Sequence, residues 1–524
     1  MKEKHAAYLS PKLLRNNIQA GLIEKLVFTD NRDVRLKDLT LYYTEEKQTE
    51  KGYEPLQFYC SKDKKTVCIA CESGRFELSP GSSRLFGSCF YLQKIEGLDR
   101  LDTSRVTNMA NMFDSCSSLT SLDLSMWDTG KVKDMHEMFR CCSGLKDLNV
   151  SAWNTGNCKS FNAFLVGCRS LEKIDISTWD TSSVTDLSLM FTGCTSLTSI
   201  ELGSIDTGNV QNMVLMFMGC ENLKCLDLGK LNTSNAKSMA GMFEGCFALE
   251  EIRGIENLDT GSVRSMRGLF RKCKSIKNLN ISKWNTKSVE DLSMLFMDCA
   301  SLKDLDLSAW DTGRVTSIDS MFTRCRSLKD PGIEHLNTSN VTVMTNVFQG
   351  CSAIESLDLS SWDTSNVKYL FGLFSSCSSL KEVDLTNWDT RGVLNVSYMF
   401  EGCRDLEKIE GITWLNTEQV REMNNAFTGC ESLKELDLRG WDTSLAIRMS
   451  DMFAGCKSLE TVRMSAASTA KNPETRGMFD YCDNLKEVEL PHHPMAARSI
   501  KTALKERNKP VRERDILDVG KYLF

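Results

Sequence analysis

The sequence has little of what catalysis, membrane insertion or nucleic-acid binding requires. It holds five histidines in 524 residues, and no phosphate-binding Gly-Lys-Ser/Thr loop, HExxH zinc motif or GxSxG nucleophile motif occurs. No run of 18 apolar residues is present, so no segment is expected to span a membrane. The net charge of −6 argues against nucleic acid or an anionic membrane as the main partner. We therefore expect no enzyme activity, cofactor or metal.

Cysteine, by contrast, is abundant and evenly spaced. Sixteen of the 22 cysteines follow one another at intervals of 26 residues, or 27 in three places. They are Cys89, Cys116, Cys142, Cys168, Cys194, Cys220, Cys246, Cys273, Cys299, Cys325, Cys351, Cys377, Cys403, Cys430, Cys456 and Cys482. Repetition at this period predicts a solenoid, in which each repeat adds one coil to a stack.

The cysteines of this column stand between apolar columns, and this favours buried free thiols that pack as small hydrophobic groups. Disulfides between coils and a metal site are the alternatives, because many cysteines in a short secreted chain usually indicate cross-links. Cys158 supports the buried-thiol interpretation, because it fills a column that is otherwise held mainly by valine.

One repeat, from Val106 to Trp127, shows the pattern that predicts the coil. Its first half places apolar residues on one side of about three helical turns, which predicts a short α- or 3₁₀-helical segment. Leu122 and Leu124 then alternate with polar residues as in a half-buried strand. Asp128-Thr129-Gly130 predicts a turn, because an aspartate side chain can accept hydrogen bonds from nearby backbone amides.

Repetition of this unit predicts the fold class: an α/β, leucine-rich-repeat-like, right-handed solenoid of about 16 rungs. Each rung of about 26 residues would supply one parallel β-strand and one short helical segment, with the sheet on the concave side. Phenylalanine, methionine and tryptophan recur in columns at these same spacings. We interpret these columns as core, not as a ligand-binding box.

The repeated motif resembles a known family. The pattern MFxGCxSLxxLDLSxWDTSxVxxM, seen in Met190–Cys194 and in Leu357–Val367, resembles the BspA-like leucine-rich-repeat surface proteins of bacteria. The resemblance covers about residues 85–490. It implies adhesion or protein binding at the cell surface or after secretion, including binding to host or matrix proteins. Members usually carry a signal peptide and an anchor, whereas neither is visible in this sequence; a cytoplasmic location as encoded is the alternative.

The sequence divides into three predicted parts: an N-terminal helix and β-rich cap over residues 1–84, the solenoid over 85–490, and a C-terminal basic tail or cap over 491–524. Ser10-Pro11 predicts the start of a helix that runs to about Leu26. Strands are expected at residues 34–43, 56–59, 66–70 and 75–78. In the tail, residues 496–507 predict a short basic helix, and the segment either caps the last rung or binds a partner.

Two small groups of metal-ligating residues lie outside the ladder. Cys68 and Cys71 form a CxxC motif with Cys60 upstream, but no second pair follows at zinc-site spacing. His492 and His493 are adjacent residues in a proline-flanked segment. We expect a structural role for both groups.

An acidic column is the candidate partner-binding surface. It lies seven residues after each ladder cysteine, at an outward position of the predicted strand. Its members are Glu96, Asp123, Asp175, Glu201, Asp227, Asp306, Asp358, Asp384, Glu410 and Asp437, with Glu489 in the last rung. Lysines three residues earlier in several rungs, such as Lys146 and Lys381, are expected to neutralise some of this charge.

Three interpretations of this column stay open: a solvated face that keeps the protein soluble, a recognition surface for a basic or mixed-charge protein, and a calcium site. For the whole chain, the first hypothesis is a non-catalytic, adhesion-type protein that binds a protein partner through its concave sheet face. The second is an intracellular scaffold or effector built on the same solenoid. In either case we expect a monomer with no nucleic-acid partner.

Overall fold

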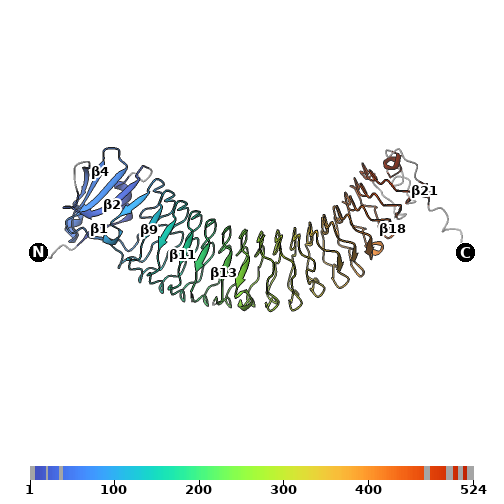
Figure 1. The fold of residues 1–524 in the computed structure, drawn as a ribbon, viewed down its shortest axis with the longest axis horizontal. Helices are drawn as coiled ribbons and strands as arrows, with labels where there is room; N and C mark the ends of the chain where they lie inside the picture. Colours follow the sequence, from blue (N-terminus) through green and yellow to red (C-terminus); the bar gives the residue numbers. More distant parts are fainter. Residues whose placement is uncertain are drawn as a thin grey trace. The chain divides into compact units, whose positions relative to one another are not determined.

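The computed structural model describes residues 6–18, 22–34, 39–203, 205–229, 231–464, 473–490, 500–505 and 512–515. The chain forms two compact units, residues 1–262 and 263–524. Both consist of short coils stacked on one another, and in the first unit an N-terminal sheet precedes the coils (Figure 1). No helix among the described residues is long and apolar enough to cross a membrane. The expected concave curvature of the sheet remains a prediction.

The N-terminal segment begins with β1 (Ala7–Leu9) and a short helix, α1 (Pro11–Asn17). Ser10 caps α1, since its hydroxyl oxygen accepts a hydrogen bond of 3.2 Å from the Leu13 N–H, and Pro11 occupies the first turn. The predicted start is therefore confirmed, but the predicted end at Leu26 is wrong. Ile18 is already extended, and the β-favouring sequence KLVFTD forms strand β2 (Lys25–Asp30).

A five-stranded mixed sheet follows, in the order β3-β4-β5-β2-β7. Its remaining strands are β3 (Leu39–Glu45), β4 (Leu56–Ser61), β5 (Thr66–Cys71) and β7 (Lys94–Glu96), with the 3₁₀ turn η1 (Lys47–Lys51) between β3 and β4. A second sheet has the order β1-β6-β8, with β6 (Phe76–Leu78) and β8 (Leu101–Asp102). The strands expected at 56–59, 66–70 and 75–78 are confirmed. Because β7 belongs to the first rung and pairs with β2, the cap sheet joins the array directly.

The rungs of the first unit supply short parallel strands. They are β9 (Ser121–Asp123), β10 (Asp147–Asn149), β11 (Lys173–Asp175), β12 (Ser199–Glu201), β13 (Cys225–Asp227) and β14 (Glu251–Arg253). Their register keeps equivalent residues together, so Leu122 pairs with Leu148 and Ile174 with Ile200. Two single-turn 3₁₀ segments, η2 (Leu98–Arg100) and η3 (Ile255–Asn257), hold the extra residue of the longer rungs.

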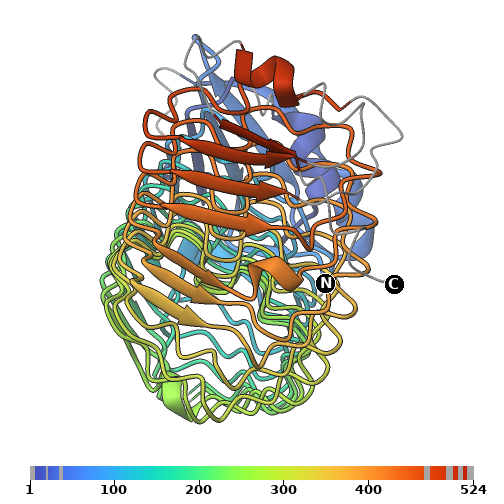
Figure 2. The same cartoon turned by 90° about the vertical axis from the view of Figure 1, so that its right-hand side faces the viewer.

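The second unit repeats the arrangement. Its strands are β15 (Ser356–Asp358), β16 (Glu382–Asp384), β17 (Lys408–Glu410), β18 (Glu435–Leu438), β19 (Thr461–Met464) and β20 (Glu487–Leu490), with η4 (Ile412–Trp414) after β17. The strands β18, β19 and β20 lie side by side in Figure 2. In the rungs of Cys273, Cys299 and Cys325, single bridges from Asn278 to Asp304 and on to Asp330 replace the strands.

The other half of each coil is not helical, contrary to the sequence prediction. It is a run of tight turns in which two residues per coil adopt the left-handed conformation, such as Asn111 (φ 55°) and Ser115 (φ 63°). Amide groups bond alternately within the coil and to the next one: Met112 N–H bonds to Met109 O, and Phe113 N–H to Met138 O. A left-handed residue at every fourth position prevents a continuous helix from forming. The turns nevertheless place inward-facing residues at the spacing that a helix would give.

The interior confirms the predicted ladder of buried thiols. All sixteen ladder cysteines are buried and all 22 cysteines are free, which leaves no support for disulfides between coils. Fourteen of these thiols also donate a hydrogen bond to a main-chain oxygen of the preceding coil. Cys142 Sγ, for example, lies 3.1 Å from Phe113 O, and the bond recurs from Cys116 to Cys482.

Aromatic and threonine side chains complete the repeated core. Phe322, Phe348 and Phe374 stack nearly parallel, with ring centroids 5.8 and 5.7 Å apart. Buried tryptophans donate their indole N–H across coils, as from Trp153 to Leu124 O at 2.9 Å. Threonines of the Asp/Asn-Thr turn do the same with their hydroxyls, as from Thr129 to Asn154 O at 2.9 Å. The tryptophan columns are therefore core, as the sequence predicts.

The chain end adds one more strand. Residues 500–505 are helical, with Ile500, Ala503 and Leu504 buried, and strand β21 (Arg512–Asp515) pairs in parallel with β20. The rest of the predicted tail, including residues 496–499, 506–511 and 516–524, lies outside the described residues. So do residues 465–472, where the repeat pattern fades in the sequence.

Candidate partner-binding surface

The acidic column predicted from the sequence lies on the outward face of the short strands. Seven of its ten members are exposed, and Glu96, Asp384 and Asp437 are half-buried. The register places Asp175 beside Glu201. It also places Asp358 beside Asp384, which lies beside Glu410. Elsewhere other residues interrupt the column: Asp123 pairs with Asn149, Asp227 with Arg253 and Asp437 with Arg463.

Every aspartate of this column also has a structural task that the sequence analysis missed. Its Oδ1 accepts a hydrogen bond from the main-chain N–H two residues later, as from Ser360 to Asp358 at 3.0 Å and from Thr386 to Asp384 at 2.8 Å. The same bond forms at Asp123, Asp175, Asp227, Asp306 and Asp437. These Asx turns end the strand and fix the direction of each carboxylate. The recurring Asp-Leu-Ser of the sequence was the available signal.

Hydrogen bonding lowers the pKa of five of these aspartates, Asp123, Asp175, Asp306, Asp358 and Asp437, and so favours their charged form. The Ser360 hydroxyl lies 2.6 Å from Asp358 Oδ1, and this bond, together with that from the Ser360 N–H, lowers the pKa of the Asp358 carboxyl. The Ser308 hydroxyl lowers the pKa of Asp306 in the same way. Bonds to the Arg439 side chain lower the pKa of Asp437. The column is therefore a row of oriented negative charges at neutral pH.

A second outward column, two residues before the first, adds to this charge. Sequence reasoning missed it because its occupants vary: in the first unit they include Ser121, Asp147 and Lys173. In the second unit the column is mainly acidic. Its acidic members there are Asp304, Asp330, Glu382, Glu435 and Glu487. Along residues 304–437, the two outward columns together hold nine carboxylates and one base, Lys408.

The lysines three residues before the acidic column were expected to neutralise it. Two of these lysines form ion pairs, and for both of them the expectation is wrong. Lys381 pairs with Glu355 at 2.8 Å, and Lys486 pairs with Glu460 at 2.7 Å. Both glutamates lie in the lysine column itself, one coil earlier. Where the acidic column is paired, its partners lie outside the lysine column: Lys25 and Lys94 pair with Glu96, Lys408 with Glu410 and Arg439 with Asp437.

Six carboxylates of the second unit have no ion-pair partner among the residues that the structure describes. They are Asp304, Asp306, Asp330, Asp358, Glu382 and Asp384. This unpaired stretch is the most strongly charged part of the sheet face. It can attract cationic groups, and the fixed aspartates lose little conformational freedom when they do so.

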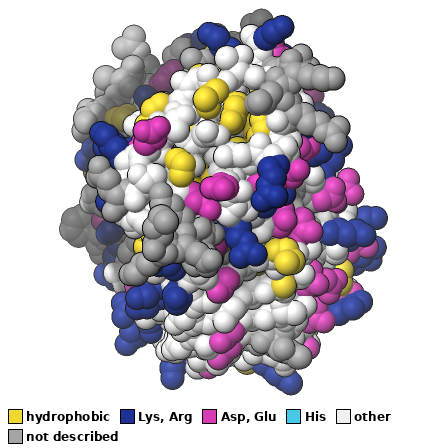
Figure 3. Space-filling view, turned by 90° about the vertical axis from the view of Figure 1, so that its left-hand side faces the viewer, with side chains coloured by type: hydrophobic (Ala, Val, Ile, Leu, Met, Phe, Trp, Pro, Cys, Tyr) yellow, Lys and Arg dark blue, Asp and Glu magenta, His cyan; other side chains and the backbone are white. Residues whose placement is uncertain are grey.

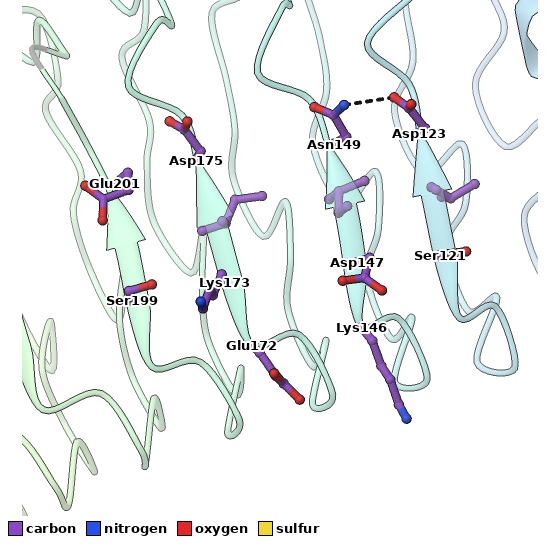
Figure 4. Close-up of a pocket in the computed structure, with 13 residues that line it drawn as sticks. Ser121, Asp123, Lys146, Asp147, Asn149, Glu172, Lys173, Asp175, Ser199 and Glu201 are labelled. Carbon is purple, nitrogen blue, oxygen red and sulfur yellow. Dashed lines mark hydrogen bonds between the residues drawn. The ribbon is translucent and has the colours of Figure 1, made fainter.

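In the first unit, the sheet face carries a hollow of about 760 Å³ where β9 and β10 adjoin β11 and β12. Asp123, Asn149, Asp175 and Glu201 follow one another near the ends of the strands, and Lys146 and Glu172 lie near their beginnings (Figure 4). The Asn149 amide donates to Asp123 Oδ1 at 3.0 Å. The hollow therefore presents mixed charge. Acidic and basic side chains are also interspersed on the face of this unit seen in Figure 3.

Burial raises the pKa of cysteine thiols both inside and outside the ladder. Burial raises the pKa of the Cys68 thiol to about 11 and that of Cys194 to about 12, which keeps both protonated and unreactive. Within the described ranges, no group of three or more His, Cys, Asp or Glu residues could hold a metal ion. His492 and His493 lie outside them. The calcium interpretation of the acidic column therefore gains no support from its geometry.

The coils, their parallel strands and their outward polar columns define a leucine-rich-repeat-like solenoid with an N-terminal mixed-sheet cap. The chain belongs to the family described as "Mycoplasma protein of unknown function, DUF285", whose model matches residues 82–174, 159–253, 247–333, 325–414 and 403–491. The match covers the whole array, and the family description names no catalytic activity. No curated protein matches the chain.

Several solved repeat proteins are similar at low identity. Toll, from the Drosophila Toll–Spatzle complex, is 16% identical, with 80% of this chain and 51% of that chain covered and a TM-score of 0.25. The functional domain of InlJ from Listeria monocytogenes, described as including a cysteine ladder, is 12% identical over 76% and 71% of the two chains (TM-score 0.18). The Arabidopsis receptor kinase HAESA, in complex with the peptide hormone IDA and SERK1, is 13% identical over 77% and 76% (TM-score 0.16). The chain spans about half the length of the Toll chain.

Proposed function

We propose that this protein is a non-catalytic binding protein that uses the outward face of its strands to hold a protein partner with basic surface groups. The observation that carries the proposal is the run of unpaired, oriented carboxylates between Asp304 and Asp384. Repeat arrays of stacked strands offer an extended surface of this kind. Opposite charge on the partner would steer its approach and fix its register.

The experiment removes charge without removing the Asx turns. In the full chain, Asp358→Asn, Glu382→Gln and Asp384→Asn keep each side-chain oxygen as an acceptor and remove three negative charges. We expect the affinity for a lysine- and arginine-rich probe peptide to fall at least about tenfold, and the remaining affinity to depend less on salt. As a control, Asp291→Asn removes one charge from an aspartate outside the two outward columns, whose Oδ1 likewise accepts a hydrogen bond from the N–H two residues later, that of Ser293. Equal affinity of the triple variant and the parent protein would refute the proposal.

The resemblance to BspA-like surface proteins favours adhesion, at the cell surface or after secretion, as the biological setting. Binding of a host or matrix protein through the predicted concave face belongs to this proposal. We infer a second candidate, an intracellular scaffold, from the 22 free thiols, because a reducing compartment preserves free cysteines. Immunolabelling of intact and permeabilised cells separates the two, since an adhesin must be accessible without permeabilisation.

A further inference from the structure

A capping column runs along the turn half of the coils, eight residues before each ladder cysteine. From Asn108 to Ser317 its occupants are asparagine, aspartate and serine only. Their side-chain oxygens accept from the N–H two residues later, as from Ser188 to Asp186 at 2.9 Å and from Ser293 to Asp291 at 2.9 Å. The array thus uses small polar residues here to satisfy a backbone donor that would otherwise lack a partner.

Five coils of the second unit lack an asparagine, aspartate or serine at this position. It holds Val343, Tyr369, Glu422, Arg448 and Glu474, and only the first two of these are apolar or aromatic. The column continues by parallel bridges from Ser317 to Val343, Tyr369 and Asn395, but Val343 and Tyr369 offer no acceptor at the capping position. Among the described residues, the N–H groups of Thr345 and Phe371 accordingly have no hydrogen-bond acceptor. Asn395 restores the cap, with 2.7 Å between its Oδ1 and the Ser397 N–H. The fold does not require apolar residues at these two places.

These residues belong to an aromatic patch made of Val343, Tyr369, Phe371, Leu394 and Tyr398. Tyr369 is 45% exposed, and the other four are half-buried at the surface. The rings of Phe371 and Tyr398 lie 5.2 Å apart at a tilt of 57°. The core beneath is already filled by the stacked ladder phenylalanines. An exposed aromatic group of this kind on a repeat surface is typical of a protein-binding site.

Two cations flank the patch. Lys368, Leu394 and Arg421 lie on successive coils and are joined by main-chain bonds of 3.0 Å, from Leu394 N–H to Lys368 O and from Arg421 N–H to Leu394 O. Lys368 and Arg421 are both exposed, and neither has an ion-pair partner among the described residues. The patch therefore has two cations in a single column beside its aromatic residues, with Glu422 next to the second of them, in contrast to the mainly acidic sheet face.

We propose that the aromatic patch is a second binding surface, which takes an acidic peptide segment of a partner protein with an aromatic or aliphatic anchor. The anchor would pack on Tyr369 and Phe371, and carboxylates of the segment would pair with Lys368 and Arg421. This surface is independent of the proposed function of the sheet face. It accounts for an apolar and an aromatic residue, Val343 and Tyr369, at two of the five uncapped positions.

Stability tests the first half of the argument without knowledge of the partner. Val343→Ser, Tyr369→Asn and Phe371→Ser return the patch to residue types found elsewhere in the same columns. Because the caps reform, we expect the full-length triple variant to unfold at the parental temperature or about 2 °C higher. The matched control, Asp291→Val, removes a cap and should unfold at a lower temperature. A clear fall for the triple variant would show that the patch serves the core, and would overturn the proposal.

Binding tests the second half. A displayed library of random 12-residue peptides, selected on the full chain, should yield sequences that combine Asp or Glu with Phe, Trp, Tyr or Leu. These peptides should bind the triple variant, and separately Lys368→Glu with Arg421→Glu, at least about tenfold more weakly. They should bind the sheet-face variant Asp358→Asn/Asp384→Asn as strongly as the parent. The assignment would be overturned if no such peptides were enriched, or if they bound the patch variants as strongly as the parent protein. It would also be overturned if the patch variants lost affinity for a single-stranded DNA probe and not for the peptides.

Discussion

At the residue scale, the ladder cysteines explain why this array uses sulfur where a methyl group would also fit. The thiol is small enough for the interior, and in fourteen coils it also donates to a carbonyl of the preceding coil, as from Cys351 to Phe322 O at 3.0 Å. The sequence predicted the burial of this column from its apolar neighbours. It could not predict the hydrogen bond, because that contact joins atoms 29 residues apart whose distance depends on how the coils stack.

The buried thiols make stability sensitive to alkali. Burial raises the pKa of Cys194 and Cys246 to about 12, whereas a thiol in an unfolded chain titrates near about 8.5. Below about pH 8.5 the thiols are protonated in both the folded and the unfolded protein, and the ladder contributes its full stability. Between about pH 8.5 and 12 the thiols lose protons only in the unfolded protein, so the free energy of unfolding falls as the pH rises. We expect the guanidinium chloride concentration at which half of the protein is unfolded to decrease steadily as the pH rises over this range.

The control for the alkaline loss replaces three ladder thiols, as Cys194→Ala, Cys220→Ala and Cys246→Ala. This variant should be less stable at pH 7 and should lose less of its stability between pH 8.5 and 11, because fewer raised pKa values remain. Exposed Cys141→Ser should leave the slope unchanged. If stability fell with pH by the same amount in the parent and in the triple alanine variant, the buried thiols would not be the cause of the alkaline loss.

At the element scale, the clearest difference between sequence and structure is the turn segment that replaces the predicted helix. Its inward residues recur at helical spacing because each four-residue turn returns the chain to the core, as a helical turn does. The spacing of the inward residues therefore cannot distinguish a helix from a run of tight turns. The signal that could have separated them is glycine just before the ladder cysteine, as at Gly193 and Gly219, where φ is 72° and 70°.

A glycine substitution distinguishes a turn from a helix. Ser376 occupies the position before Cys377 with φ 61° and is exposed. In a helix, Ser376→Gly would destabilise the protein; in the observed left-handed conformation it should stabilise it by about 1 kcal/mol, because glycine adopts that conformation without strain. Urea denaturation of the full chain measures the change. Ala353→Gly, at a position without positive φ, is the matched control and should cost about 0.5–1 kcal/mol.

At the scale of the whole molecule, the fixed period predicted the number of coils, their parallel strands and the apolar interior. The same repetition hid the departures that concern function. The second outward acidic column and the aromatic patch consist of residues that differ from coil to coil, so no period marks them. Phe371 becomes a neighbour of Tyr398 only when the coils stack.

The last strand shows how the array ends. Strand β21 pairs with β20 so that Arg512 lies opposite Glu487 and Arg514 opposite Glu489, while Glu513 takes the position of the buried Val488. In the coils, that middle position is apolar, as in Leu357 and Val383. We infer that β21 covers an edge that would otherwise pair with another chain.

Removal of residues 491–524 should therefore change the oligomeric state. The parent protein is expected to sediment as a monomer, whereas the shortened chain exposes the β20 edge and should associate in a concentration-dependent way. Analytical ultracentrifugation over a hundredfold range of concentration measures this. A shortened chain that stays monomeric at every concentration would show that β20 needs no cover.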